Sequence, residues 1–279
     1  ITEEILQKKL YFIMSDNVIK PGSYEHKFDG IRRIYGKQNQ ALLKNLHVAV
    51  VGIGGVGSWT VEAFARSGLG EITIIDWDDV CYSNTNRQIH ALDKNIGKSK
   101  VDVLKERVFE INSSCKVNAI REYYTAENAN HIISNDLDYV IDAIDKKNQK
   151  IHLINHCKKI NIPIITCGGA GGKTDPSQIK IADLGESYND PLLFQMRKQL
   201  RRDLGLEKDV KVNFNVPCVF SAESMLYPDC QGNVSTEKVK GSEKPRQLDC
   251  SQGFGSTTYV TGCFGFFIAS YVINNLFKK

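Results

Sequence analysis

The sequence predicts an α/β fold in which helices cover both faces of a mostly parallel β-sheet. Short apolar runs rich in β-branched residues alternate with segments of helical periodicity between Leu46 and Gly169. Such alternation is typical of parallel strands joined by right-handed helical crossovers. The apolar runs show no polar alternation, as expected for strands that are covered on both faces. The composition, 42% hydrophobic and 24% charged over 279 residues, excludes wholesale disorder, collagen and a polytopic membrane protein.

The first part of the chain predicts five strands separated by helices. The strands are expected over residues 46–53, 71–78, 116–121, 138–145 and 162–169. The helices between them are expected from a glycine-rich turn to residue 65, over 98–112, from 125 to about 134, and up to 159. Val101, Leu104 and Val108 recur on one face of the second helix, together with Ile111. Thr125 is a suitable N-cap for the third.

The chain after Gly172 predicts an elaborated C-terminal half. Strands are expected over 178–184 and 210–220, with a basic amphipathic helix over 190–204 between them. Residues 227–252 are polar and rich in Gly, Ser and Lys, which predicts a mobile loop. Residues 259–277 are almost as long and apolar as a membrane span. Their Gly, Ser and Asn content favours a buried C-terminal helix, and attachment to a membrane surface is the alternative.

Charge and cysteine content narrow the class of protein. Lys and Arg number 36 and Asp and Glu 32, so the net charge is +4, which permits a nucleic-acid partner without requiring one. None of the 8 cysteines forms a CxxC pair, so the sequence predicts neither a disulfide framework nor a four-cysteine zinc site. Residues 1–17 lack the apolar run of a secretory signal. We therefore expect a cytoplasmic protein with free thiols.

A glycine-rich turn between the first strand and its helix predicts a nucleotide site. Glycines at a strand–turn–helix junction let the backbone approach a phosphate at the helix N-terminus. Asp76 ends the second strand about 20 residues later, where an acidic residue grips a ribose hydroxyl. This Rossmann-like arrangement predicts that the nucleotide is held by Gly52, Gly54, Gly55, Gly57 and Asp76.

The residues that follow favour a triphosphate over NAD. Arg87 and Lys100 lie beyond the ribose-binding strand, where cations would neutralise phosphates and where hydride transfer needs none. Asp142 and Asp145 end the fourth strand, and a carboxylate there is well placed to hold Mg²⁺ on phosphates. No GxxxxGK[ST] motif is present, so the chain is not a P-loop enzyme.

This constellation resembles the ubiquitin-activating-enzyme-like (ThiF/MoeB) superfamily of adenylating proteins. The resemblance rests on GIGGVGS at 52–58, DWDDV at 76–80, NTNRQ at 84–88, GKSK at 97–100 and DAID at 142–145. It implies a homodimeric enzyme that makes an acyl-adenylate from a carboxylate and ATP. It also implies an ATP site formed by the glycine turn with Asp76, Asp78, Asn86, Arg87, Lys100 and Asp145. Arg87, Lys100 and Asp145 would act in catalysis, with Asp145 beside Mg²⁺.

The superfamily also uses an arginine from the N-terminal segment, for which Arg32 and Arg33 are candidates. By the same resemblance, residues 28–279 would form one ThiF/MoeB-like adenylating domain, preceded by an N-terminal extension over 1–27.

Later motifs resemble one branch of the superfamily, the tRNA threonylcarbamoyladenosine dehydratases. These motifs are RRIYG, NTNRQIHAL, GGAGG at 168–172, DPSQI at 175–179, CVFS at 218–221, YP at 227–228 and GFGS at 253–256. The resemblance implies an ATP-dependent ligase or cyclase that adenylates the carboxylate of threonylcarbamoyladenosine beside the tRNA anticodon and closes a ring with loss of water. The alternative is an adenylyltransferase that activates the C-terminus of a small sulfur-carrier protein, which the missing zinc cysteines disfavour. A catalytically silent nucleotide-dependent scaffold and an NAD enzyme remain further alternatives.

Several residues stay open between a functional and a structural role. Cys230 lies in the expected mobile loop, near the place where some family members carry a reactive cysteine, and is a possible nucleophile. The carbonyls of GGAGG could hold a monovalent cation. The basic residues of 197–202 and Lys238, Lys240 and Lys244 could contact tRNA phosphates or could form a solvated face. His90 and His131 are expected to be scaffold residues. Sulfur-relay proteins are possible partners.

Overall fold

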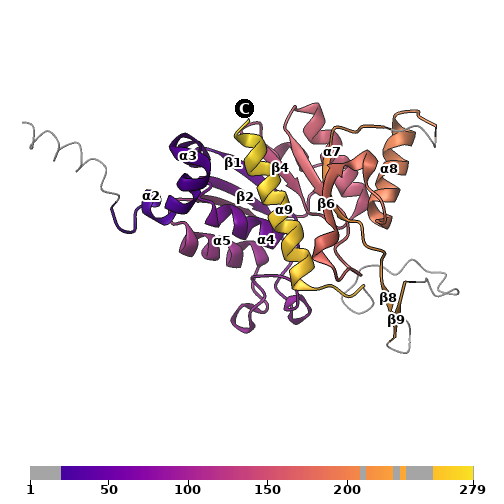
Figure 1. Cartoon of the computed structure of the whole chain (residues 1–279), viewed down its shortest axis with the longest axis horizontal. Coiled ribbons are helices and arrows are strands. Elements are labelled where there is room, and N and C mark those ends of the chain that lie inside the picture. The colour runs from indigo at the N-terminus through magenta and orange to yellow at the C-terminus, as the bar shows by residue number, and fades with distance from the viewer. Residues whose placement is uncertain (1–19, 208–211, 229–232, 237–253, 279) are drawn as a thin grey trace, which may run out of the picture.

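A seven-stranded sheet in the order β3-β2-β1-β4-β5-β7-β6 forms the centre of the protein (Figure 1). The computed structural model describes residues 20–207, 212–228, 233–236 and 254–278. The strands of the sheet are β1 (His47–Val51), β2 (Glu71–Ile75), β3 (Lys116–Ile120), β4 (Tyr139–Asp142), β5 (Ile164–Cys167), β6 (Ile179–Asp183) and β7 (Pro217–Ser221). A separate two-stranded ribbon pairs β8 (Tyr227–Pro228) with β9 (Val234–Ser235). The expected α/β fold with a mostly parallel sheet is confirmed.

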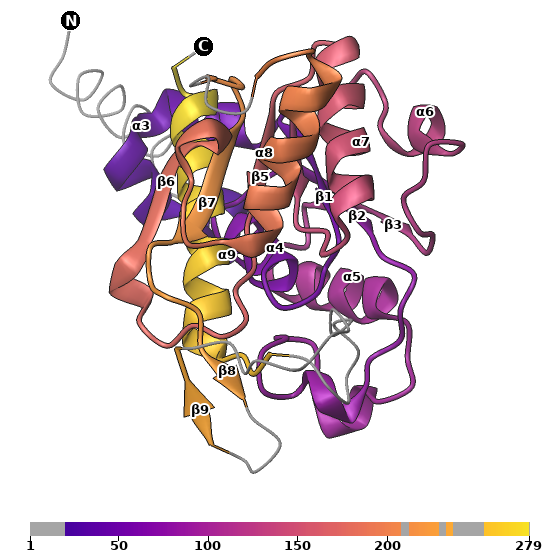
Figure 2. The same cartoon turned by 90° about the vertical axis from the view of Figure 1, so that its right-hand side faces the viewer.

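Helices cover both faces of this sheet, as expected. In chain order they are α2 (Tyr24–Lys27), α3 (Asp29–Leu43), α4 (Gly57–Arg66), α5 (Lys100–Ile111), α6 (Ala129–Ile132), α7 (Lys147–Lys159), α8 (Pro191–Asp203) and α9 (Thr258–Leu276). Short 3₁₀ turns lie at η1 (Tyr82–Asn84), η2 (Asp93–Asn95), η3 (Pro176–Gln178) and η4 (Leu184–Glu186). Figure 2 shows α7 and α8 side by side on one face, with α9 on the other.

Alternate residues of each central strand enter two separate cores. In β1, Val48 and Val50 pack with residues of α4, α5 and α9, whereas Ala49 and Val51 pack with residues of α6, α7 and α8. The period of two along a strand sends neighbouring side chains to opposite faces. A strand buried on both faces therefore reads as the continuous apolar run that the sequence shows.

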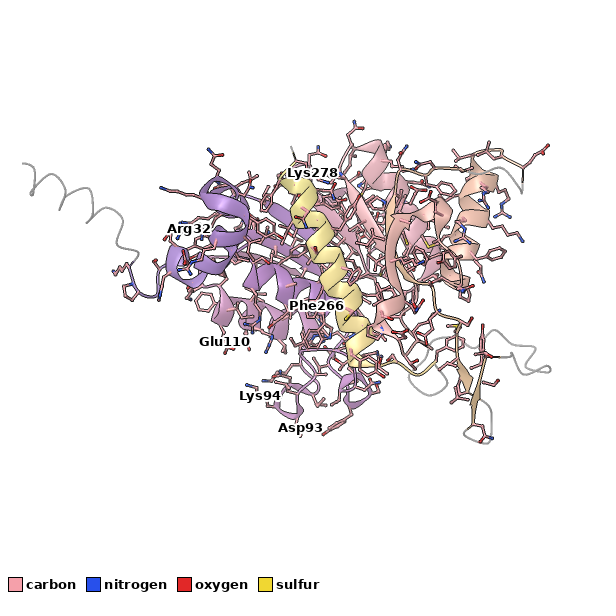
Figure 3. The ribbon with its side chains drawn as sticks, viewed as in Figure 1. Arg32, Asp93, Lys94, Glu110, Phe266 and Lys278 are labelled. Atoms are coloured by element: carbon pink, nitrogen blue, oxygen red, sulfur yellow. The ribbon has the colours of Figure 1, made fainter. Side chains whose placement is uncertain are left out.

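The C-terminal helix α9 lies across the first of these cores. It packs against α4 and against β5, β6 and β7. By length and composition it could cross a membrane, and 56% of its most apolar 18-residue window is buried inside the protein. Its buried side includes Val260, Phe264 and Ile268, in agreement with the expected buried C-terminal helix. Phe266, by contrast, is 47% exposed on the outer side (Figure 3).

β6 runs antiparallel to β7 and forms the edge of the sheet, a direction that the sequence did not predict. The structure differs from the sequence-based expectation in two places. The expected strand at 210–220 is confined to Pro217–Ser221, and residues 208–211 lie outside the described part. Thr125 caps no helix: its hydroxyl and amide bond Asn128, and the short helix α6 begins only after Asn128. Thr125 and Asn128 satisfy each other, so the chain makes a turn where a helix start was expected.

Candidate active site

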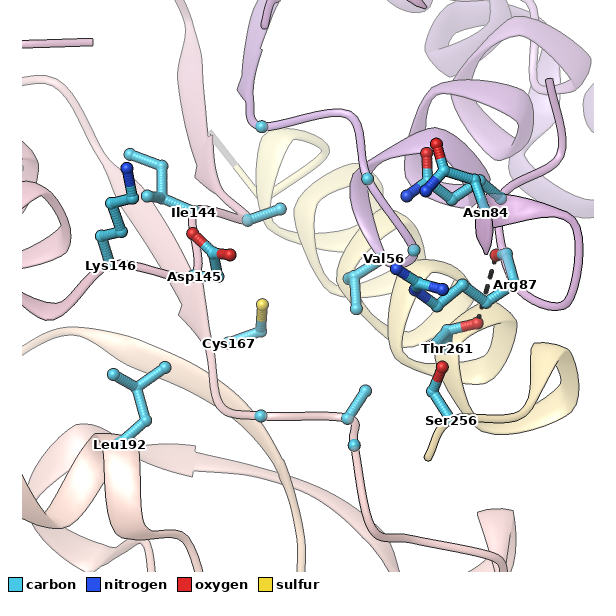
Figure 4. A pocket seen from close by; sticks show the side chains of 18 of the residues that line it. Val56, Asn84, Arg87, Ile144, Asp145, Lys146, Cys167, Leu192, Ser256 and Thr261 are labelled. Carbon is cyan, nitrogen blue, oxygen red and sulfur yellow. Dashed lines mark hydrogen bonds between the residues drawn. The ribbon is translucent and has the colours of Figure 1, made fainter. Parts of the chain in front are cut away.

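A cavity of about 980 Å³ opens at the carboxyl end of the parallel strands. Ligands of open α/β sheets bind in this position because the loops that leave the strands converge there. The cavity is lined by nine of the ten residues expected to bind the nucleotide: Gly52, Gly54, Gly55, Asp76, Asp78, Asn86, Arg87, Lys100 and Asp145. Figure 4 shows Asp145 facing the opening on one side, with Arg87, Thr261 and Ser256 on the other. The sequence therefore located the pocket.

The glycine turn is built by close backbone approaches. Gly52 adopts φ 84°, and a Cβ there would lie 2.8 Å from the Ala143 carbonyl oxygen, so the turn packs tightly against the end of β4. A Cβ on Gly57 would lie 1.9 Å from the Gly52 carbonyl oxygen. Gly57 does not line the cavity. It is buried behind the turn, and its role is to let α4 start close to β1.

Asp76 is held in place by two backbone amides. Its carboxylate accepts hydrogen bonds from the amides of Ile53 and Asp78, both at 2.9 Å. Burial raises the pKa of Asp76, although Lys100, whose Nζ lies 4.0 Å away, and the two amides act in the opposite direction. A partly buried carboxylate with fixed orientation at the end of β2 suits the expected contact with a ribose hydroxyl.

The sequence predicted that Lys100 binds a phosphate, but in the structure its ammonium group is already paired. Its side chain is almost wholly buried, and Nζ forms an ion pair with Asp78 at 2.8 Å. The lysine therefore reaches a phosphate only together with, or in exchange for, this carboxylate. The pairing also keeps the buried ammonium charge neutralised before a ligand arrives.

Arg87 carries a guanidinium without a carboxylate partner in the described part of the chain. Its Nη1 donates to the carbonyl of Ser83 at 2.8 Å and to Oδ1 of Asn86 at 2.9 Å. Its own carbonyl accepts a hydrogen bond from the indole Nε1 of Trp59 at 2.9 Å. These contacts point a cation with unneutralised charge into the cavity beside the glycine turn, where an anionic ligand would be attracted.

The two carboxylates that end β4 have different roles. Asp142 is completely buried, accepts a hydrogen bond from Thr166 Oγ1 at 2.6 Å and pairs with Lys150 Nζ at 3.0 Å. It belongs to the core and is not available to a metal ion. Asp145 is exposed and lines the cavity. Of the two, only Asp145 can meet a ligand.

Besides its ion pair with Asp142, Lys150 bonds the backbone that leads to Asp145. Nζ donates to the carbonyl of Asp142 at 3.3 Å and to that of Ile144 at 3.0 Å. Desolvation is the largest single effect and would lower the pKa of Lys150, but the charge and hydrogen bond of Asp142, together with the nearby Cys167 and Cys218, raise it overall. An ammonium group that stays charged in the core therefore fixes the backbone immediately before Asp145. No sequence pattern identified this residue, since a lysine inside a helical segment usually points to solvent.

A second buried lysine supports the cavity wall that follows β5. Lys173 follows the glycine-rich loop 168–172 and donates to the carbonyls of Asn189 and Glu223. Asp190 accepts from the amides of Gly169 and Leu193, at 2.8 and 2.9 Å, and so joins this loop to the start of α8. Burial lowers the pKa of Lys173 and raises that of Asp190. Both residues line the cavity, and no sequence motif singled out either of them.

Other residues singled out in the sequence lie outside this cavity. Arg32 and Arg33 both pair with Asp29 on α3, and neither lines the cavity (Figure 3). Arg197, from the basic run of α8, is buried and bonds Ser187, so it does not form a solvated surface. Cys230, Lys238, Lys240 and Lys244 fall outside the described residues.

His90 is buried in the scaffold, but among the residues that the structure describes its ring lacks the hydrogen bonds expected of a scaffold histidine. It is 1% exposed, and neither ring nitrogen has a hydrogen-bond partner in the described part of the chain.

Two aromatic residues at the mouth of the cavity were missed: Trp77 lies inside the DWDDV motif but was given no role, and Tyr123 belongs to no motif. Trp77 and Tyr123 stack with ring centroids 5.9 Å apart, and each is 50% exposed. The Tyr123 hydroxyl donates to Asp78 at 3.4 Å, and Lys146 Nζ lies 5.2 Å from the Tyr123 ring centroid. This pair lies beside Asp76 and extends the ribose end of the cavity with a flat apolar surface.

Comparison with known proteins agrees with this geometry. The pattern of the ThiF family matches residues 25–279. The chain belongs to the ThiF family. Within the family it is similar to the tRNA threonylcarbamoyladenosine dehydratase of Escherichia coli (strain K12), at 43% identity over 94% of this chain and 98% of that protein. It is also similar to the dehydratase of Haemophilus influenzae, at 46% identity over 92% of this chain and 95% of that one.

A solved structure of a ThiF-type enzyme has the same fold. The E. coli tRNA N6-threonylcarbamoyladenosine dehydratase, solved in complex with ATP, superposes with a TM-score of 0.80 at 41% identity, over 93% of this chain and 97% of that one. The sequence-based assignment to this family and to its dehydratase branch is confirmed.

Proposed function

We propose that this protein is an ATP-dependent tRNA threonylcarbamoyladenosine dehydratase. The observation that carries the proposal is the cavity itself. It combines a glycine turn, an oriented ribose-binding carboxylate and an unneutralised arginine with one exposed carboxylate across the opening. The similarity to dehydratases covers nearly the whole of this chain and of those proteins, so it includes both walls of the cavity.

The chemistry begins with activation of a carboxylate. An oxygen of the threonylcarbamoyl carboxylate forms a bond to the α-phosphorus of ATP, and the bond from that phosphorus to pyrophosphate breaks. A nitrogen or oxygen of the same modification then attacks the activated acyl carbon, loses its proton and displaces AMP. The carboxylate oxygen leaves with AMP, so the nucleoside loses one water and ATP becomes AMP and pyrophosphate. The attacking atom is tethered, so proximity supplies much of the rate.

The residues of the cavity suit this reaction. Backbone groups of Gly52, Gly54 and Gly55 would approach the phosphates at the start of α4. Asp76 would hold the ribose with Asp78 beside it, and Asn86 would lie with Arg87 at the phosphate end. Arg87 would stabilise the charge that develops on the phosphates as pyrophosphate leaves. Lys100 would join it once its pair with Asp78 opens.

Asp145 is the residue that we propose holds Mg²⁺ together with the ATP phosphates. In the described part of the chain no group of three or more His, Cys, Asp or Glu could hold a metal ion. One carboxylate is sufficient when phosphate oxygens and water supply the other ligands, as is common for Mg²⁺. The bound ion would neutralise phosphate charge. We propose no zinc site. A monovalent cation at the 168–172 loop is proposed from the GGAGG sequence only.

The first experiment is mass spectrometry of nucleosides from tRNA that carries threonylcarbamoyladenosine. Incubation with the protein, ATP and Mg²⁺ should remove one water from this nucleoside, and omission of ATP should leave it unchanged. An unchanged nucleoside despite ATP binding would contradict the dehydratase assignment. Pyrophosphate release that depends on a sulfur-carrier protein and not on tRNA would instead support the alternative substrate.

Variants test the roles of Arg87 and Asp145. Arg87→Ala removes the free cation and should reduce turnover by roughly 100-fold or more, as is typical for the loss of one preorganised charge-stabilising group. Asp145→Ala should abolish adenylation at ordinary Mg²⁺ concentrations, and excess Mg²⁺ should restore part of the rate. Arg66→Ala is the matched control, because Arg66 is exposed, pairs with Glu62 and does not line the cavity. Full activity of Arg87→Ala would remove that residue from the phosphate site.

The proposal also covers the domain organisation, oligomeric state and cellular location of the protein. We propose that residues 28–279 form a single adenylating domain after an extension over 1–27, and that the protein is a cytoplasmic homodimer. Within a dimer, Arg32 or Arg33 could act at the site of the second subunit, since neither reaches the cavity of its own chain. Sulfur-relay proteins and a nucleophilic Cys230 stay proposals from the sequence.

A further inference from the structure

Part of the cavity lining comes from segments that carry none of the residues assigned to the nucleotide. One part of the lining comes from the ends of β1, β2 and β4, with the ribose carboxylate Asp76 and the Trp77–Tyr123 pair at its far end. The other part comes from the loop after β5, the segment 225–227 and the segment 254–256. This second group lies beyond Arg87 and Asp145 and is named here the acceptor lobe.

Main-chain hydrogen bonds join the segments of the acceptor lobe. The amide of Gly172 donates to the Gly255 carbonyl at 2.7 Å, and the amide of Leu226 donates to the Gly172 carbonyl at 2.8 Å. A Cβ on Gly171 would lie 3.3 Å from Phe254 Cβ, so the loop and this segment are in close contact. Three segments far apart in the sequence are therefore held as one wall.

The acceptor lobe is also linked to the phosphate end of the cavity. The side-chain amide of Asn86 donates to the Ser256 carbonyl at 2.8 Å. Asn86 is next to Arg87, so the wall begins where the phosphates of ATP would end, and Figure 4 shows Ser256 below Arg87 at the edge of the opening. A group held by this wall would thus lie within reach of the reacting phosphate.

The surface of the wall is aromatic. Tyr227 and Phe254 form an edge-to-face pair, with ring centroids 5.7 Å apart and planes at 75°. Both rings are half-buried and both line the cavity, together with Met225. The two rings meet almost at a right angle, so a planar aromatic ligand can stack on the face of one ring and meet the other with its edge. Proteins that act on unpaired RNA bases hold them on surfaces of this kind.

We propose that Tyr227 and Phe254 hold the adenine base of the modified tRNA nucleoside, one ring stacked on its face and the other packed against its edge, while the base of ATP lies at the other end of the cavity beside Trp77 and Tyr123. The proposal rests on the proposed function for the identity of the base. In this arrangement the two bases flank the phosphates. The substrate base is taken out of the anticodon loop, and its threonylcarbamoyl arm extends between Asp145 and Arg87.

The experiment compares binding of the RNA with binding of ATP. Tyr227→Leu and Phe254→Leu keep an apolar side chain but remove the flat ring. Each should raise KM for an anticodon stem-loop carrying threonylcarbamoyladenosine by roughly 10- to 100-fold, as expected for the loss of one base–aromatic stack. The dissociation constant for ATP should stay within about twofold of the unaltered protein. Tyr227→Phe keeps the ring and should behave like the unaltered protein.

A second readout does not require turnover. A stem-loop with 2-aminopurine at the position of the modified adenosine should lose fluorescence on binding, because stacking on an aromatic ring quenches it. The two leucine variants should abolish the quenching. Tyr188→Leu is the matched control, since Tyr188 forms an edge-to-face pair with Phe220, at 5.3 Å and 71°, but does not line the cavity.

The outcomes separate this inference from the proposed function. An unchanged KM for the RNA in both leucine variants, or an equal loss of ATP affinity, would overturn the inference. Absence of quenching in the unaltered protein would do the same. Failure of the unaltered protein to dehydrate the nucleoside would reject the function. Quenching that still depended on Tyr227 and Phe254 would then support a base site in its own right.

Discussion

A buried histidine shows how a single residue can set the response of the protein to acid. Burial, together with the nearby charges of Lys100 and Arg107, lowers the pKa of His90 to about 3 from its ordinary 6.5. The folded state therefore favours the neutral ring, whereas the unfolded chain binds a proton below pH 6.5. The contribution of His90 to stability is complete above 6.5 and is lost as the pH falls toward 3.

We therefore expect His90→Phe to flatten the dependence of stability on pH. Between pH 7.5 and 5.5 the unaltered protein should lose about 1.4 kcal/mol of unfolding free energy through this one group. The variant should lose less by that amount, as measured by urea denaturation at the two pH values. His131→Phe serves as the control, because His131 is exposed. Equal pH dependence in His90→Phe and the unaltered protein would show that His90 titrates normally.

The sequence predicted which residues line the cavity better than it predicted which side chains pair with one another. Asp76, Arg87 and Asp145 line the cavity as expected, because their positions follow from where strands end. The pairing of Lys100 with Asp78 and the burial of Asp142 could not be predicted, since both depend on side chains from other elements. Burial alone separates Asp142 from Asp145, and a sequence motif does not encode it.

Among the elements, the contact between α4 and α9 determines how the glycine turn is supported. A Cβ on Gly265 of α9 would lie 2.8 Å from Trp59 Cβ and 2.9 Å from both the Thr60 amide nitrogen and the Val56 carbonyl oxygen. The helices therefore touch at their backbones. Because α4 starts at the glycine turn, its position also sets the position of the phosphate-binding amides.

Gly265→Ala should separate the two helices and weaken ATP binding. Overpacking of this kind costs about 1–3 kcal/mol, partly offset by the better helix propensity of Ala. Urea denaturation and ATP titration would measure both effects. Gly262→Ala is the matched control on the same helix, because its Cβ would meet Trp59 Cδ2 at 3.6 Å, which is an ordinary contact. Gly262→Ala should be at least as stable as the unaltered protein, and equal behaviour of the two variants would contradict this account.

Most helices and strands could be predicted from the pattern of apolar residues in the sequence. The elements that could not be predicted depend on contacts that this pattern does not encode. The continuous apolar runs predicted β1, β2, β4 and β5 to within a few residues, because buried parallel strands need no polar face. The direction of β6 could not be predicted. β6 pairs antiparallel with β7 although α8 lies between them in the chain, and composition carries no information on strand direction. The turn at Thr125 depended on a hydrogen bond to Asn128 that competes with helix formation.

For the whole molecule, both cores share the strands of one sheet, so ligand binding at its edge should stabilise the chain as a unit. ATP at about 100 times its dissociation constant should add about 2.7 kcal/mol to the unfolding free energy. We expect a single thermal transition whose Tm rises with ATP and does not move with NAD⁺, measured by differential scanning fluorimetry. If NAD⁺ raised Tm as much as ATP does, the result would support the alternative that the protein is an NAD enzyme.

Because two lysines are buried against main-chain carbonyls at the carboxyl edge of the sheet, chemical labelling can report how often this edge opens. Lys150 and Lys173 are 0% and 2% exposed, and each ammonium group donates to two main-chain carbonyls. Amine-reactive reagents modify only lysines that reach solvent. The rates at which these two lysines acquire a label therefore measure the spontaneous opening of the segments that each one ties together, and a ligand bound in the cavity should slow both rates.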